Sequence, residues 1–169
     1  MEINRIFVVG AGTMGSGIAQ TAAVAGFQVS LMDVLPEQLE RAKKGIAKSV
    51  AKLASKGVID ENQAGAVNQL GYVGDYNTLS EADYVIEAAT ENPQLKLEIF
   101  TELDRLARPE VILEYNTSSI RLKKIAAATD LTEKVIGMHF LNPVPLMRLV
   151  EVIRGLATSD GTAATAVEL

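Results

Sequence analysis

The sequence contains no cysteine and only one histidine among its 169 residues. The absence of cysteine excludes disulfide bonds, thiolate metal sites and a cysteine nucleophile. One histidine is too few for a histidine-rich metal centre, so we expect no metal site in this chain. Any acid–base chemistry that needs an imidazole must therefore use this single side chain, His139.

Long apolar runs, an excess of basic residues and a leader-like start are also missing. The apolar stretches are short and interrupted, which predicts that no segment spans a membrane. The 16 basic and 21 acidic residues leave a net charge of −5, which argues against a general nucleic-acid-binding surface. The start, MEINRIFVVGAG, has an acid at position 2 and soon reaches glycine, so it predicts a first strand rather than a signal peptide. We therefore expect a cytoplasmic location.

What the sequence does contain is an alternation of short β-branched runs and longer helical patterns. Its 48% apolar and 22% charged residues suit one soluble globular domain. We expect strands at 3–9, 29–32, 72–73, 83–87, 111–113, 134–139 and 149–153. We expect helices at 13–25, 36–56, 60–68, 94–106 and 122–128, and one that begins at 159. This alternation predicts an α/β fold with a doubly wound, mostly parallel sheet and helices on both faces.

A glycine-rich turn, Gly10-Ala11-Gly12-Thr13-Met14-Gly15, follows the first expected strand and opens the first expected helix. Gly10 allows a tight turn, Gly12 lets the backbone approach a pyrophosphate, and Gly15 lets the helix lie close to the strand. The helix N-terminus then offers free N–H groups and the positive end of its dipole to phosphates. This context predicts a dinucleotide site in a Rossmann-type domain, although glycine turns without a ligand also occur.

Asp33 lies at the end of the second expected strand, 23 residues after Gly10. A carboxylate at this place accepts hydrogen bonds from the two hydroxyls of an adenosine ribose and repels a 2′-phosphate. The motif therefore predicts NAD rather than NADP as the cofactor. FAD is compatible with the glycine turn in principle, but nothing further along the sequence supports it.

The only histidine ends the expected strand at 134–139, at the carboxyl edge where parallel sheets bind ligands. An imidazole can remove a hydroxyl proton while hydride leaves the neighbouring carbon. Glu151 lies in the next expected strand and is a candidate to orient the His139 ring and stabilise its cation. Both residues also have plain structural explanations. A lone histidine at a strand end is often only a packed side chain, and Glu151 can be a solvent-exposed strand residue.

Hydroxyl groups follow another expected strand, in the segment Asn116-Thr117-Ser118-Ser119. They reach the same edge of the sheet and can donate a hydrogen bond to a substrate oxygen. The alternative is a helix cap, in which Ser118 or Ser119 bonds the first turn of the following helix. Periodicity alone leaves both interpretations open.

Four segments together resemble one family: VVGAGTMGSGIAQ, DYVIEA, NTSSI and, most specifically, VIGMHFLNPVPLMRLVEVIRG. The similarity covers nearly the whole chain and is to the short-chain 3-hydroxyacyl-CoA dehydrogenases, most closely the bacterial 3-hydroxybutyryl-CoA dehydrogenases. It implies an NAD-dependent oxidoreductase of fatty-acid and butanoate metabolism that interconverts (S)-3-hydroxyacyl-CoA and 3-ketoacyl-CoA by hydride transfer. The implied substrate is a short acyl-CoA such as 3-hydroxybutyryl-CoA.

The resemblance also implies roles for single residues. It implies that His139 is the catalytic base, that Glu151 is its partner, and that Ser118 hydrogen-bonds the substrate oxygen near the nicotinamide. Cofactor contacts are implied for the glycine turn and for Asp33, Glu91, Lys96, Ser118 and Asn142. Contacts with coenzyme A are implied for Ser49, Lys56 and Ser118. A cation also suits the phosphates of coenzyme A, but Lys56 is equally compatible with an ordinary solvated lysine.

The sequence departs from the family pattern in three places. Glu114 and Tyr115 precede Asn116 where the family carries small residues, which puts bulk and charge next to the strand end and affects substrate fit. Pro93 stands where the family has another residue. The family continues into a second, all-helical domain that is absent from this chain, and the resemblance implies that a homodimer forms through that domain.

Two alternatives to this dehydrogenase remain. The chain can be a non-catalytic NAD-binding module, because part of the family's pocket lies in the second domain. It can also be a dehydrogenase of another 3-hydroxyacyl-CoA, such as 3-hydroxyadipyl-CoA. In each case we expect small-molecule ligands, and neither a membrane nor a nucleic acid as a partner.

Overall fold

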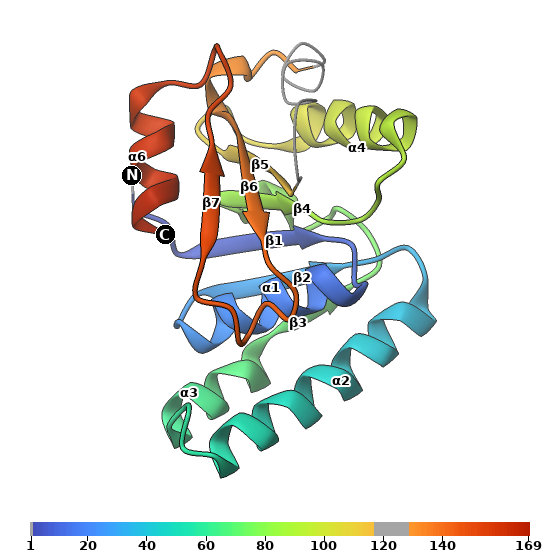
Figure 1. Cartoon of the computed structure of the whole chain (residues 1–169). Helices are drawn as coiled ribbons and strands as arrows, with labels where there is room; N and C mark the ends of the chain where they lie inside the picture. Colours follow the sequence, from blue (N-terminus) through green and yellow to red (C-terminus); the bar gives the residue numbers. More distant parts are fainter. Residues whose placement is uncertain (1, 117–128) are drawn as a thin grey trace.

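The structure is a computed structural model that describes residues 2–116 and 129–169 (Figure 1). Its strands are β1 (Arg5–Val9), β2 (Gln28–Met32), β3 (Gly71–Val73), β4 (Tyr84–Glu87), β5 (Ile112–Asn116), β6 (Val135–Phe140) and β7 (Val150–Ile153). Its α-helices are α1 (Thr13–Val24), α2 (Pro36–Ser55), α3 (Glu61–Ala66), α4 (Pro93–Leu106) and α6 (Asp160–Glu168). Short 3-10 helices are η1 (Val67–Gln69), η2 (Leu79–Glu81) and η3 (Thr132–Lys134).

These strands form one sheet in the order β3-β2-β1-β4-β5-β6-β7. Every neighbouring pair is parallel except β6 and β7, which are antiparallel. The chain winds outward from β1 to β3, returns to β4 beside β1, and winds outward on the other side to β7. The predicted doubly wound, mostly parallel sheet is therefore confirmed, and the switch point lies between β1 and β4.

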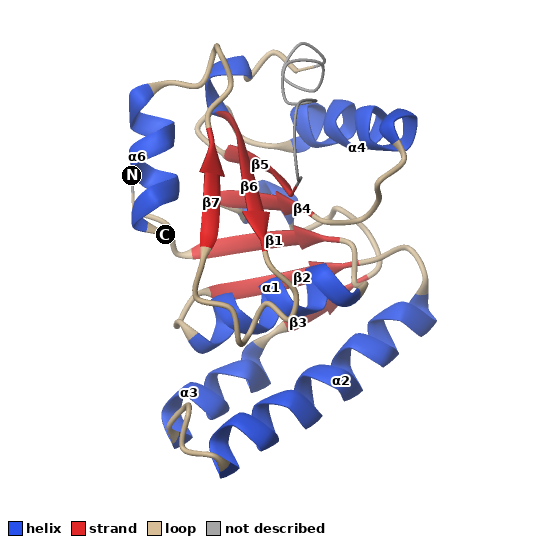
Figure 2. Cartoon of the chain, in the orientation of Figure 1, coloured by secondary structure: helices blue, strands red, loops and turns tan. Residues whose placement is uncertain are grey.

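Helices lie on both faces of the sheet, as predicted (Figure 2). On one face, α1, α2 and α6 contribute Ile18, Ile46 and Ala163 to a buried cluster. On the other face, α4 contributes Phe100 and Leu103 to a second cluster. Successive strand residues point to opposite faces, so the central strands supply side chains to both clusters. This explains why the sequence of these strands is almost continuously apolar.

Local signals set the helix ends. Pro36 occupies the first turn of α2, and the chain turns away at Gly57, whose φ is +68°. The Asn92 side chain accepts hydrogen bonds from the first N–H groups of α4, and Ser159 caps α6 in the same way. The helices predicted at 36–56 and 94–106 therefore agree closely with α2 and α4.

Two predicted boundaries are wrong, and one prediction lies outside the described residues. β5 does not end at 113 but continues to Asn116, because Glu114 and Tyr115 pair with β4 and β6. The helix expected over 60–68 is instead α3 followed by the 3-10 turn η1. The helix expected over 122–128 falls in the part of the chain that the structure does not describe.

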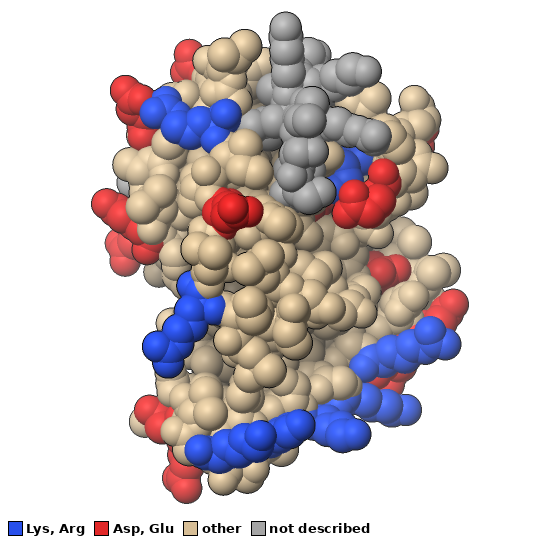
Figure 3. Space-filling model, viewed as in Figure 1, with Lys and Arg blue, Asp and Glu red and all other residues tan. Residues whose placement is uncertain are grey.

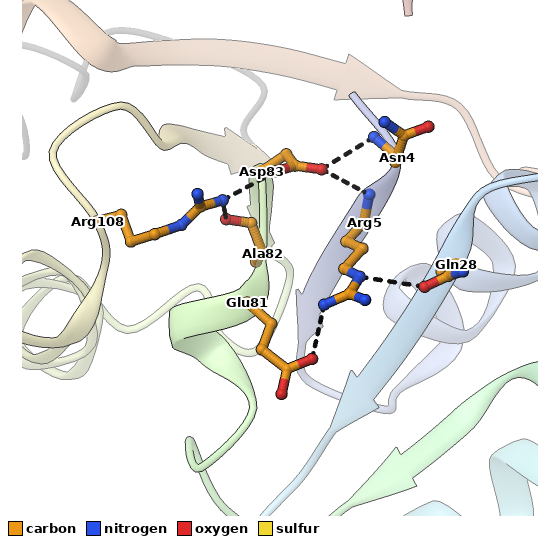
Figure 4. A network of polar contacts seen from close by, with 7 residues as sticks. All are labelled: Asn4, Arg5, Gln28, Glu81, Ala82, Asp83 and Arg108. Atoms are coloured by element: carbon orange, nitrogen blue, oxygen red, sulfur yellow. Dashed lines mark hydrogen bonds and ion pairs between the residues drawn. The ribbon is translucent and has the colours of Figure 1, made fainter. Parts of the chain in front are cut away.

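Polar contacts tie β1, β2 and β4 together at their N-terminal ends (Figure 4). Asp83 accepts hydrogen bonds from the backbone N–H groups of Asn4 at 3.0 Å and Arg5 at 2.9 Å, and it pairs with Arg108 at 2.9 Å. Burial by itself raises the pKa of the Asp83 carboxyl, but these donors outweigh it and lower the pKa below its ordinary value. Arg5 also pairs with Glu81 at 2.8 Å. This network stabilises the sheet edge opposite the C-terminal ends of the strands.

The described residues contain neither a candidate membrane-spanning helix nor a candidate metal-binding cluster. Within 2–116 and 129–169, no helix has both the length and the apolar character needed to cross a membrane. The same residues hold no group of three or more histidine, aspartate and glutamate side chains that could bind a metal ion.

Candidate active site

The glycine turn joins β1 to α1, and its first and last glycines shape it. Gly10 has a φ of +97°, and a Cβ there would lie 2.4 Å from the Cα of Ala89. A Cβ on Gly15 would lie 1.7 Å from the carbonyl oxygen of Gly10. A side chain at either position would collide with backbone, so this turn requires glycine at both.

Gly12 and the first turn of α1 face open space. A Cβ on Gly12 would have no other described atom within 4 Å. Gly12 is the N-cap of α1, and among the described residues no side chain caps this helix and no acid lies in its first turn. The backbone N–H groups and the positive end of the helix dipole are therefore available to an anion such as a pyrophosphate.

Asp33 lies beside the glycine turn at the end of β2. Its Oδ2 accepts a hydrogen bond from the N–H of Ala11 at 2.9 Å, and its Oδ1 accepts one from the N–H of Leu35 at 3.0 Å. The carboxylate is thus held in one orientation and remains partly exposed. In the same turn Thr13 is exposed and Met14 packs against the core.

His139 and Glu151 are direct cross-strand neighbours on β6 and β7. Nδ1 of His139 lies 2.6 Å from Oε2 of Glu151. The side chains are 30% and 57% exposed, so the pair is open to a ligand. The sequence placed Glu151 in the next strand, and the antiparallel return of β7 is what brings its carboxylate to the imidazole.

The strand register brings His139 to the edge that carries the glycine turn. β1, β4, β5 and β6 are parallel, so their C-terminal ends meet at one edge of the sheet. Val9, Glu87, Tyr115 and Gly137 lie in register across these strands. The glycine turn follows Val9 directly, and His139 follows Gly137 by two residues, so both lie at this edge of the sheet.

A buried ion pair, which the sequence analysis missed, lies at the same edge between β4 and β5. Lys96 Nζ lies 2.6 Å from Oε2 of Glu87, donates to the carbonyl oxygen of Asn116 at 3.3 Å and sits 4.1 Å from the centre of the Tyr115 ring. Burial raises the pKa of the Glu87 carboxyl, and Lys96 and the N–H of Ala89 oppose that rise. A carboxylate ending a buried strand, with a lysine nine residues later, is the signal that could have suggested the pair. Lys96 thus has an internal partner, and its contact with the cofactor stays a prediction.

The loop between β6 and β7 closes a groove beside the glycine turn. Asn142 is exposed, and the following Val144 packs on Gly17 of α1, where an added Cβ would lie 3.0 Å from the Val144 side chain. The groove has a volume of about 540 Å³ and runs between this loop, α1 and α2. It includes Gly12 and Asn142 in its lining, so it begins at the predicted cofactor turn.

The remaining predicted residues lie on helix surfaces or outside the described part of the chain. Ser49 is half-buried on α2, Lys56 is exposed as the C-cap of α2, and Glu91 is exposed just before α4. Ser118 falls within residues 117–128, which the structure does not describe. The predicted contacts of these residues with coenzyme A, cofactor or substrate therefore stay predictions.

Glu114 and Tyr115 do not project from the strand end as expected. Both are buried, at 0% and 3% exposure, because β5 continues past them. They point to opposite faces of the sheet, and Tyr115 packs edge-on against Phe100 of α4 with 6.1 Å between ring centres. The expectation of bulk and charge beside the open edge is therefore wrong: both side chains lie within the two core layers.

Known proteins share the sequence and fold of this chain. Residues 5–169 match the family model described as 3-hydroxyacyl-CoA dehydrogenase, NAD binding domain. The chain belongs to this family. Its fold is that of the NAD-binding domain of a 3-hydroxyacyl-CoA dehydrogenase.

Individual relatives are similar over nearly all of the chain. A Bacillus subtilis protein named as a probable 3-hydroxybutyryl-CoA dehydrogenase is 52% identical over 164 residues, which is 96% of this chain and 57% of that protein. The crystal structure of a (S)-3-hydroxybutyryl-CoA dehydrogenase from Ralstonia eutropha superposes with a TM-score of 0.94 at 42% identity, over 99% of this chain and 59% of that one. A 3-hydroxyadipyl-CoA dehydrogenase of Escherichia coli is 41% identical over 160 residues, 94% of this chain and 34% of that protein. The chain thus spans less than two thirds of the length of these relatives.

Proposed function

We propose that this chain supplies the NAD-binding and proton-transfer half of an enzyme that interconverts (S)-3-hydroxyacyl-CoA and 3-ketoacyl-CoA. The observation that carries the proposal is the contact of 2.6 Å between His139 Nδ1 and Glu151 Oε2. This pair lies at the sheet edge that also bears the glycine turn. The names of the similar proteins favour 3-hydroxybutyryl-CoA as the substrate.

The residues at the turn fit NAD. Gly12 and the uncapped first turn of α1 suit a pyrophosphate, and the fixed Asp33 carboxylate suits the hydroxyls of an adenosine ribose. NAD, when bound, supplies the hydride acceptor at C4 of its nicotinamide. We propose that Glu91, Lys96, Ser118 and Asn142 complete this cofactor site.

His139 is proposed to move the proton of the substrate. Because Nδ1 is held by Glu151, the ring presents Nε2 to the hydroxyl group and removes its proton there. The Glu151 carboxylate fixes the tautomer and stabilises the imidazolium that forms. In the reducing direction, the same Nε2–H protonates the new alkoxide, and we propose that Ser118 donates a hydrogen bond to this oxygen.

The proposed path of the coenzyme A portion runs through the groove along α2. The groove leads from the loop after His139 toward the exposed face of α2. Residues 36–56 carry six basic and two acidic side chains, and Lys and Arg side chains follow α2 across the surface (Figure 3). A local excess of positive charge suits the phosphates of coenzyme A, which supports contacts with Ser49 and Lys56.

Turnover of acetoacetyl-CoA and NADH by the chain, followed by absorbance, tests the function directly. His139→Gln should lower kcat about a thousandfold, because the proton loses its acceptor while the cofactor contacts remain. NADH affinity, measured by fluorescence, should stay close to that of the wild type. Glu151→Gln should give a smaller loss of kcat, because the base remains but loses its orienting charge. If His139→Gln retains wild-type turnover, His139 is not the base.

Two other functions predict different outcomes of the same assay. A non-catalytic NAD-binding module would bind NADH and turn over no acyl-CoA. An enzyme for 3-hydroxyadipyl-CoA would prefer the dicarboxylate substrate over acetoacetyl-CoA, and the similarity to the Escherichia coli protein is the observation that favours testing it. A panel of acyl-CoA substrates separates these possibilities.

We further propose a setting for the reaction. The family resemblance favours a cytoplasmic homodimer in fatty-acid or butanoate metabolism, joined through a helical domain of the kind expected from the sequence. Sedimentation of the protein in solution measures the oligomeric state. A protein that carries such a domain and remains a monomer at micromolar concentration would contradict the dimer.

A further inference from the structure

Gln20 is a buried polar residue that the sequence analysis did not single out. It lies on α1, is 2% exposed and forms part of the lining of the groove. Its Nε2 donates a hydrogen bond to Oγ of Ser49 on α2 at 2.9 Å. A buried amide is costly unless it has such a partner, so this bond holds both side chains in one arrangement. It links the helix that follows the glycine turn to α2.

The direction of this bond determines what Ser49 can do. A serine hydroxyl has one proton to donate and two lone pairs that accept. Other hydroxyls on the helices, such as Thr21 and Thr101, donate to a carbonyl of their own helix four residues earlier. Among the described residues, no hydrogen bond has Ser49 as its donor. Because Gln20 is the donor in this bond and Ser49 donates to no described acceptor, the serine proton is available to an acceptor outside the helix.

The place of Ser49 on α2 puts this proton beside the groove. Ser49 continues the helical row of Ala42, Gly45 and Ile46, which line the groove, because residues three, four and seven apart share one face. Lys56 lies a further seven residues along the chain, on the same side of the helix as Ser49. In an acyl-CoA, the acceptors that could meet Ser49 there are carbonyl oxygens of the pantetheine arm and phosphate oxygens.

We propose that Gln20 is a positioning residue for the acyl-CoA: by donating to Ser49, it keeps the Ser49 proton free for an acceptor on the coenzyme A portion. The identity of this ligand rests on the proposed function. Without the Gln20 amide, the Ser49 hydroxyl turns to the carbonyl of Gly45, as Thr21 turns to that of Gly17. The chain should then bind coenzyme A more weakly, while its affinity for NAD stays the same.

The test is a titration of the chain with coenzyme A and, separately, with NADH. Gln20→Met keeps the volume of the side chain and removes its donor, so it should weaken coenzyme A binding about tenfold and leave NADH binding unchanged. Gln20→Glu keeps the shape and reverses the bond, because a carboxylate accepts the Ser49 proton. It should give the same selective loss. Thr21→Val is the matched control, since it removes only a bond within α1 and should change neither affinity.

A double-mutant cycle separates positioning from packing. If Gln20 acts through Ser49, then adding Gln20→Met to Ser49→Ala weakens coenzyme A binding no further than Ser49→Ala alone. Thermal melting reports whether each variant is folded, and either Gln20 variant suffices for the cycle. Additive losses, or equal losses of NADH and coenzyme A affinity, overturn the inference.

The outcome also distinguishes this inference from the proposed function. If the wild-type chain binds coenzyme A with the expected variant pattern but converts no acyl-CoA, then the proposed reaction fails and the role of Gln20 stands. If the chain converts acyl-CoA and the Gln20 variants bind coenzyme A like the wild type, the reaction stands and the role of Gln20 is refuted. A wild-type chain that binds no coenzyme A overturns the inference as well.

Discussion

The side-chain carboxyl group of Glu114 is buried in the core of the protein. It lies on β5 between Ile86 of β4 and Ile136 of β6 and is 0% exposed. Among the described residues, neither of its carboxyl oxygens has a hydrogen-bond partner. Burial raises the pKa of this carboxyl to about 8, and the neighbouring Tyr84 hydroxyl opposes the rise. The group therefore holds its proton at neutral pH in the folded chain.

This proton links stability to pH. The pKa of Glu114 is 4.5 when the chain is unfolded and about 8 when it is folded, so the folded state binds the proton more tightly. The contribution to stability is complete below the unfolded pKa and is lost as pH rises through the folded pKa. We expect the free energy of unfolding of the wild type to fall by up to about 5 kcal/mol across that pH window because of this group. Glu114→Gln should not show this fall.

Urea unfolding at about pH 5 and about pH 8 measures this difference. Glu110→Gln, in the exposed turn before β5, is the matched control and should keep the pH dependence of the wild type. If Glu114→Gln and the wild type lose the same stability between the two pH values, then Glu114 does not release its proton in this range.

At the scale of elements, the junction of β1 and α1 depends on how closely the helix approaches the strand. The Gly15 backbone of α1 packs on the Gly10 carbonyl with no space for a methyl group. Gly65 on α3 has open space where a Cβ would stand. The same substitution should therefore have opposite effects at these two helical positions.

Gly15→Ala should destabilise the chain by about 3 kcal/mol, because its Cβ must push α1 away from the glycine turn. Gly65→Ala should instead stabilise it by about 0.5–1 kcal/mol through the higher helix propensity of alanine. Urea midpoints give both values. Similar midpoints for the two variants would show that α1 can shift without cost.

Gly12→Ala lies at the same junction, but it tests cofactor binding and not the stability of the fold. Its Cβ meets no described atom, so the urea midpoint should stay close to that of the wild type. The methyl group would occupy the space proposed for the pyrophosphate, so NADH affinity should fall about tenfold or more. Unchanged NADH affinity would place the pyrophosphate elsewhere.

At the scale of the whole molecule, charge is distributed unevenly. The chain has a net charge of −5, yet residues 36–56 carry six basic and two acidic side chains, a local excess of four positive charges. An anionic substrate is therefore repelled by the molecule as a whole and attracted by α2 (Figure 3). On the proposed function, we therefore expect such a substrate to dock along α2.

Salt should weaken the binding of coenzyme A. Raising ionic strength from about 0.05 M to about 0.5 M shortens the range of electrostatic attraction, so the Kd for coenzyme A should rise several-fold. Pantetheine, which lacks the phosphates, is the control and should bind with a Kd that does not respond to salt. If both ligands respond alike, the charge of α2 does not guide the substrate.

Much of the fold follows from short-range patterns. β-branched runs, the helical spacing of apolar residues and proline at the start of α2 predict elements within a few residues of their observed bounds. The end of β5 was predicted wrongly because Glu114, as a charged residue type, is a poor match for a buried strand. Pairing with β4 and β6 outweighs that local preference.

By itself the sequence determined the class of fold, the glycine turn with Asp33, and the family to which the chain belongs. The glycine turn and Asp33 depend on spacings within one stretch of chain, while the fold class and the family depend on local patterns repeated along nearly the whole sequence. Only the tertiary structure decided which side chains meet: His139 with Glu151, Lys96 with Glu87, and Gln20 with Ser49. The physical reason is that such contacts arise when strands and helices become neighbours in space. Strand order, the antiparallel return of β7 and the packing of α2 on α1 are not encoded in any single segment.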